Sequence, residues 1–99
     1  VQTVMLPTTL EIIGESAFYG CTGVKEINIP KNVTTVGNYA FSSCSGLKTV
    51  VFYGDAPSIA PYAFSRVTAD AYYPADNGTW TAGIMQNYGG KLTWVKNAE

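Results

Sequence analysis

The chain has 99 residues, of which 46% are hydrophobic and 13% are charged, with a formal net charge of −1 and no histidine. This length limits it to one domain. The near-neutral charge argues against a nucleic-acid-binding or membrane-surface patch, and the lack of histidine removes the commonest general base and metal ligand.

An internal repeat of 23 residues organises the first two-thirds of the sequence. Three rows, residues 1–23, 24–46 and 47–67, align without gaps. Apolar residues occupy the same columns in every row; three such columns are Val4, Ile27 and Val50, then Leu6, Ile29 and Phe52, then Phe18, Phe41 and Phe64. Because one coil cannot bury its own apolar face, we expect successive coils to stack so that equivalent side chains form continuous buried columns.

Each row begins with a predicted β-strand. In the first row, Val4 and Leu6 alternate with Thr3 and Met5, and this period of two indicates one buried and one exposed face. Pro7 then ends the strand because proline has no N–H to donate. Stacked coils would place these strands side by side in a parallel sheet.

A second apolar alternation follows the proline and stops at a glycine, Gly14 or Gly37. The next column holds Glu15, Asn38 and Pro61, residue types that favour the start of a helix. We therefore expect a short helical turn in each coil, with the Ala-Phe pair after it pointing inward.

The period fails after Phe64, and residues 68–99 are predicted to form a C-terminal capping segment. Residues 71–74 indicate a strand that arrives about two residues early, and Asn77-Gly78 indicates a turn. Thr79 is predicted to cap a helix that ends near Asn87, before the glycine pair at 89–90. Residues 91–95 should form a final strand. A solenoid needs such a terminal unit to cover its last coil.

The second row, VKEINIPKNVTTVGNYAFSSCSG, resembles the repeat of the BspA-like family of leucine-rich-repeat proteins. The resemblance covers residues 1 to about 67, and the tail is similar to the closing segment of such proteins from gut bacteria. Coil three departs from the pattern, since Tyr53 replaces the proline and Val67 replaces the cysteine. The resemblance implies a leucine-rich-repeat solenoid and adhesion at a bacterial cell surface or in the extracellular space.

Strand alternation predicts which residues form the binding face. The outward positions of the main strands carry mixed, weakly charged side chains, and repeat proteins bind protein ligands on such faces. The predicted binding residues are Thr3, Met5, Glu26, Asn28, Thr49, Val51 and Tyr53. The expected partner is a host or bacterial surface protein, and neither nucleic acid nor membrane insertion is expected.

We expect no enzymatic activity, no cofactor and no metal. Without histidine no Ser-His-Asp triad can form, and the seven carboxylates are scattered over different coil positions. Two alternatives to a protein-binding module are a structural spacer and cap for a larger protein, and a carbohydrate-binding module that uses Trp80 and Trp94. Core packing is the main interpretation of these two tryptophans.

Two further expectations concern the cysteines and the first coil. Cys21 and Cys44 share a column, where they are either small buried side chains or, less favoured by their parallel orientation, a disulfide. The first coil would expose Val4, Leu6, Ile13 and Phe18. Its edge is therefore expected to meet further repeats upstream or a second copy of the chain.

Overall fold

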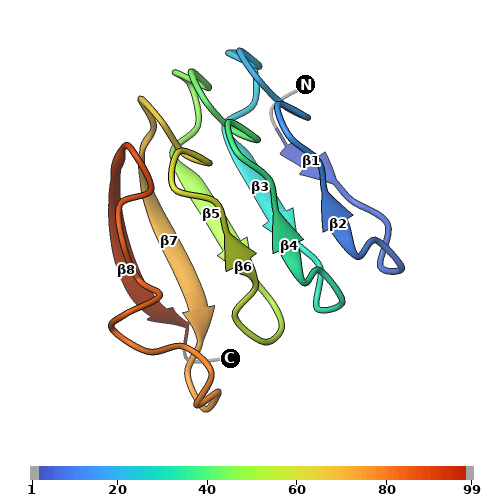
Figure 1. Ribbon diagram of the computed structural model, residues 1–99, viewed down its shortest axis with the longest axis vertical. Helices are drawn as coiled ribbons and strands as arrows, with labels where there is room; N and C mark the ends of the chain where they lie inside the picture. The colour runs from blue at the N-terminus through green and yellow to red at the C-terminus, as the bar shows by residue number, and fades with distance from the viewer. Residues whose placement is uncertain (1–2, 98–99) are drawn as a thin grey trace.

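The chain winds into a β-solenoid with two parallel sheets (Figure 1). The computed structural model describes the backbone of residues 3–97 and the side chains of residues 6–97. The larger sheet has the order β1-β3-β5-β7-β8, formed by Thr3–Met5, Glu26–Ile29, Thr49–Phe52, Thr68–Pro74 and Lys91–Asn97. The smaller sheet has the order β2-β4-β6, formed by Ile12–Ile13, Thr35–Val36 and Ser58–Ile59.

The strand register follows the sequence repeat and then shifts once. Val4 pairs with Ile27 and Ile27 with Val50, so that each coil is 23 residues long. Val50 then pairs with Ala71, only 21 residues later, which confirms that this strand arrives two residues early. Ala71 pairs in turn with Trp94, and the 23-residue spacing returns. The segment after residue 67 therefore continues the solenoid by a fourth turn that ends in β8.

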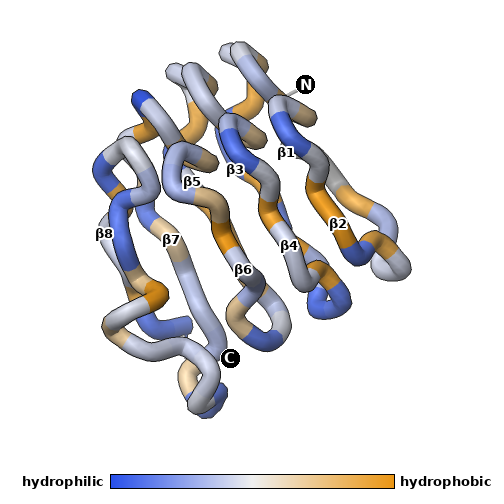
Figure 2. The backbone as a smooth tube through the Cα atoms, viewed as in Figure 1, coloured by the Kyte–Doolittle hydropathy of each residue, from blue (hydrophilic) through white to orange (hydrophobic). Residues whose placement is uncertain are grey.

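The apolar columns meet between the two sheets, as the repeat predicts. Rings of Phe18 and Phe41 are stacked with centroids 5.3 Å apart, and those of Phe41 and Phe64 are 5.1 Å apart. Apolar residues recur at equivalent points of successive coils, whereas the loop tips range from near white to blue (Figure 2). Phe64 and Ile27 are fully buried. Burial of these columns favours stacking of the coils, because each apolar Å² removed from water contributes about 25 cal/mol.

The prediction of a helical turn in each coil is wrong, because within residues 3–97 the chain forms no helix. After Gly14, alternate backbone N–H groups bond within the coil and across to the next coil. Ala17 donates to the Gly14 carbonyl, but Phe18 donates to the Ala40 carbonyl at 2.7 Å. Ser16 has a φ of 58°, which lies outside the right-handed helical region. Hydrogen bonds between neighbouring coils thus replace the bonds that a helix would make within itself.

The capping helix predicted from Thr79 to Asn87 is also wrong. This segment makes isolated turns, and only one N–H, that of Met85, donates to the carbonyl four residues earlier. The segment instead connects β7 to β8 through turns without regular secondary structure. Gly83 and the threonines of this segment, Thr79 and Thr81, also have low helix propensity.

The first coil is covered better than the sequence predicts. Ile13, which was expected to be exposed, is only 2% exposed. Leu6 and Phe18 are half-buried against the core, and the side chain of Val4 lies outside the described residues. Ile13 pairs with Val36 of the second coil, so that it belongs to the buried core.

Candidate binding face

The outward face of the larger sheet carries rows of side chains that the strand register places side by side. The first row crosses β3, β5, β7 and β8 near their starts and comprises Glu26, Thr49, Asp70 and Thr93. The second row crosses the middle of the same strands and comprises Asn28, Val51, Tyr72 and Val95. Both acidic side chains of these rows are therefore at one end of the face.

Five of the seven predicted binding residues lie together on this face. Glu26, Asn28 and Thr49 are half-buried, and Tyr53 is 55% exposed. Val51 is only 9% exposed, since it lies between Asn28 and Tyr72 in the second row. It can therefore shape the face but offers little contact area. That these residues bind a ligand stays a prediction.

The other two predicted residues are Thr3 and Met5. Their backbones pair with Glu26 and Asn28, in register with the two rows. Their side chains lie outside the described residues.

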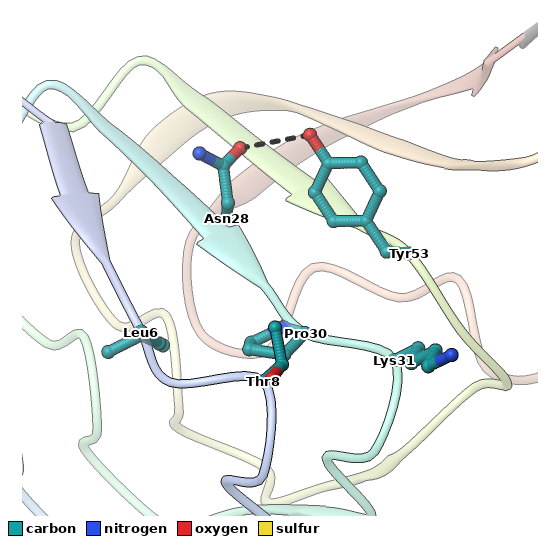
Figure 3. A pocket seen from close by; sticks show the side chains of 6 residues that line it. All are labelled: Leu6, Thr8, Asn28, Pro30, Lys31 and Tyr53. Atoms are coloured by element: carbon teal, nitrogen blue, oxygen red, sulfur yellow. Dashed lines mark hydrogen bonds between the residues drawn. The ribbon is translucent and has the colours of Figure 1, made fainter.

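A groove of about 480 Å³ opens at the downstream ends of β1, β3 and β5. Its lining is mostly apolar and comprises Leu6, Thr8, Asn28, Pro30, Lys31 and Tyr53. The hydroxyl of Tyr53 donates a hydrogen bond to Asn28 Oδ1 at 3.3 Å, which ties the side chain to the neighbouring strand (Figure 3). Leu6 and Thr8 follow β1, and Pro30 and Lys31 follow β3. The groove thus crosses three coils.

Sequence reasoning missed four of these lining residues, Leu6, Thr8, Pro30 and Lys31, and it also missed Tyr72 and Val95 on the sheet face. Alternation within the early strand at 71–74, combined with the repeat register, could have assigned Tyr72 to the outward face. No such signal exists for Thr8 or Lys31, because they lie where the chain leaves the strand.

Trp80 and Trp94 belong to an aromatic cluster that also contains Phe52 of β5. Trp80 is 6% exposed, and its indole N–H donates to the Gly54 carbonyl at 2.9 Å. Its ring packs against Phe52 and Trp94, with centroids 4.9 and 5.6 Å away. Trp94 is half-buried and donates its indole N–H to the Gln86 carbonyl. These contacts confirm the interpretation as core packing.

The two cysteines are free thiols. Cys44 is buried and Cys21 is half-buried, and the Cys44 thiol donates to the Phe18 carbonyl at 3.0 Å. Burial raises the pKa of Cys44 above its ordinary value of 9.0, so the thiol is protonated at neutral pH and is a poor nucleophile. Among residues 3–97 no group of three or more histidine, cysteine or acidic side chains is arranged to hold a metal ion.

The described part of the chain provides no helix that could cross a lipid bilayer. Chemically, the outward face offers mixed polar contacts, two acidic groups at one end and an apolar groove with a lysine at the other. Such a face is suited to binding an irregular polypeptide surface.

Comparison with known proteins agrees with the repeat. The family model described as BspA type Leucine rich repeat region (6 copies) matches residues 1–72. No curated protein and no solved structure matches the chain. Leucine-rich-repeat proteins are generally non-catalytic and mediate protein interactions, and BspA-like members are generally associated with bacterial surfaces or secretion. The match covers more than half of the sequence, and the chain belongs to the BspA type leucine-rich-repeat family.

Proposed function

We propose that this chain is a non-catalytic module that binds a protein ligand on the outward face of its five-stranded sheet. The single observation that carries the proposal is the apolar groove beside Tyr53, which opens on a face of mixed polar residues. Protein interfaces combine an apolar anchor in a pocket with a polar rim. The groove is the place for the anchor, and the two strand rows supply the rim.

The parallel sheet supports this proposal because it holds the contact residues rigidly. Each main strand between the two edges has a hydrogen-bonded neighbour on both sides. The Tyr53 hydroxyl is tied to Asn28, so that its ring loses less conformational freedom when a ligand binds. The Lys31 side chain is exposed at the rim, where it favours a ligand with an acidic group near its apolar anchor.

The proposal is tested by comparing two tyrosine variants. Candidate host and bacterial surface proteins are captured on the immobilised chain, and the affinity of each captured protein is then measured by calorimetry. Tyr53→Ala should weaken binding by about 30-fold, a loss of about 2 kcal/mol that is typical of a central aromatic anchor.

Tyr19→Ala is the matched control, because Tyr19 is exposed to a similar extent (59%) but lies on the turn after β2, outside the strands of the larger sheet. It should leave the affinity unchanged. Equal losses in both variants would assign the contact to another surface. If no protein is captured at all, the chain is better described as a structural spacer.

We further propose that the protein acts in adhesion outside the cell or on its surface. The support is the general association of the family with bacterial surfaces and secretion. Brief protease treatment of intact cells that produce the protein should remove it, while cytoplasmic markers stay intact. Resistance of the protein in intact cells, but not in lysed ones, would contradict this location.

We also propose that the edge strand β1 pairs with a strand of an upstream repeat or of a second copy. Within the described residues β1 is hydrogen-bonded to β3 alone, and an open strand edge is a template for pairing. Light scattering of the 99-residue chain tests the second copy: a dimer would support it, and a monomer at high concentration would contradict it.

A further inference from the structure

We propose that Asn77 is a site of spontaneous covalent modification, at which the folded last turn promotes its own deamidation. Asn77 and Gly78 lie in the loop that follows β7, which ends at Pro74. A side chain added at Gly78 would meet nothing within 4 Å. The Gly78 N–H also makes no hydrogen bond to a described residue. Within the described residues, the backbone N–H next to the Asn77 amide therefore has no hydrogen-bond partner, and the space around Gly78 is open.

The contacts of the Asn77 side chain favour attack by this nitrogen. Asn77 Oδ1 accepts hydrogen bonds from the backbone N–H of Thr79 at 3.0 Å and from the Thr79 hydroxyl. Negative charge develops on that oxygen when a nucleophile adds to the carbonyl carbon, and donors already in place stabilise it. Asn77 Nδ2, the future leaving group, donates to Asp55 Oδ1 at 2.9 Å. Both ends of the amide are thus held in place.

The reaction consists of a ring closure and a hydrolysis. The Gly78 nitrogen forms a bond to Cγ of Asn77 and loses its proton, and the bond from Cγ to Nδ2 breaks. The leaving nitrogen takes up one proton and departs as ammonia, so the closure is balanced. Water then opens the cyclic imide at either carbonyl and yields aspartate or isoaspartate, without any oxidation or reduction.

The product changes the contact between the third and fourth turns. The amide that donates to Asp55 becomes a second carboxylate, and two like charges in contact repel each other. Thr79 is involved as well, because its hydroxyl oxygen accepts the N–H of Ala56 at 2.9 Å. Trp80 follows directly in the sequence and covers Phe52. Modification at Asn77 is therefore expected to loosen the last turn of the solenoid.

The test follows the conversion of each asparagine in the intact folded chain at neutral to mildly alkaline pH, by peptide mapping and mass spectrometry. Asn32 is the internal control, because its Nδ2 also bonds across to the preceding coil, to the Thr8 carbonyl, but Val33 follows it. Asn77 should convert faster than Asn32. It should also convert faster than in the same chain unfolded by concentrated urea.

Two variants separate geometry from sequence. Thr79→Val removes the hydroxyl donor and should slow the conversion about five-fold, as expected for one hydrogen bond. Gly78→Ala should slow it by shielding the nitrogen, and circular dichroism checks that both variants fold. The proposal is overturned if Asn77 converts no faster than Asn32, if unfolding does not slow the conversion, or if folded Thr79→Val retains the original rate.

Discussion

Phe41 lies at the centre of the aromatic column, between the rings of Phe18 and Phe64. It is 1% exposed, and its backbone N–H donates to the Ala63 carbonyl. Its side chain therefore joins the second coil to both neighbours. The stability of the stack should depend more on this residue than on any exposed aromatic.

Phe41→Ala should lower the free energy of unfolding by about 3–5 kcal/mol, because it removes a large buried ring and leaves a cavity. Chemical denaturation followed by circular dichroism measures the change. Tyr39→Ala, at a residue that is 37% exposed, should cost far less. Equal losses in the two variants would show that the aromatic column does not hold the coils together.

Cys44 predicts a dependence of stability on alkaline pH. Its pKa is raised by burial in the folded chain, so the unfolded chain releases this proton first as pH rises above about 9. The contribution of the neutral thiol is therefore complete below pH 9 and is lost as pH rises towards the higher folded pKa.

The Cys44→Val variant isolates this effect, since Val67 already occupies the same column in the next coil. At neutral pH the variant should differ from the parent by less than about 1.5 kcal/mol. Above pH 9 the parent should lose stability more steeply than the variant in denaturation curves. Parallel pH profiles would contradict a buried Cys44 thiol.

At the level of the element, close backbone contact between coils requires glycine at particular positions. A Cβ added to Gly46 would lie 2.3 Å from the Thr22 carbonyl oxygen, whereas one added to Gly14 would meet nothing within 4 Å. Gly46→Ala should therefore destabilise the fold by about 1–3 kcal/mol through overpacking. Gly14→Ala should change stability by no more than about 0.5 kcal/mol.

Thermal and urea unfolding of the two glycine variants provide the comparison. A Gly46→Ala chain that is as stable as Gly14→Ala would indicate that the first and second coils are further apart than described.

The strands were predictable from sequence, whereas the helices predicted from sequence do not form. One physical reason explains both outcomes. Alternation of Ile27 and Ile29 with polar neighbours is a local signal of burial, and the repeat adds the register between coils. By contrast, the column of Glu15, Asn38 and Pro61 favours a helix locally, but the Phe18 N–H bonds to the next coil instead. Tertiary hydrogen bonding overrode local preference there.

The candidate site likewise has a part that the sequence predicts and a part that it does not. Alternation correctly assigned Glu26, Asn28 and Thr49 to the outward face, because it depends only on strand geometry. The groove was not predictable, since Thr8 and Lys31 reach it from segments that leave the strands after a proline. Their position is set by how the chain bends, which no short sequence pattern specifies.

Across the whole molecule, we propose that residues 1–67 form the three repeat coils and that residues 68–99 form their cap. The last strand supports this division, because Leu92 is buried while Lys91, Thr93 and Lys96 are exposed. The strand therefore presents apolar side chains to the core and polar ones to water, as a terminal unit requires.

Removal of residues 68–99 should uncover Phe52 and Phe64 on the third coil, since both lie against the fourth turn. The shortened chain is expected to aggregate or to lose cooperative unfolding, which size-exclusion chromatography and circular dichroism would detect. A shortened chain with the midpoint of the full chain would rule out the capping role.

The stacking of equivalent side chains is tested most directly by nuclear Overhauser spectroscopy of the phenylalanine rings. We expect cross-peaks between Phe18 and Phe41 and between Phe41 and Phe64, whose centroids are 5.3 and 5.1 Å apart. No cross-peak is expected between Phe18 and Phe64, which are two coils apart. Absence of the two neighbouring cross-peaks in the folded chain would contradict the solenoid, and with it the sheet face on which binding is proposed.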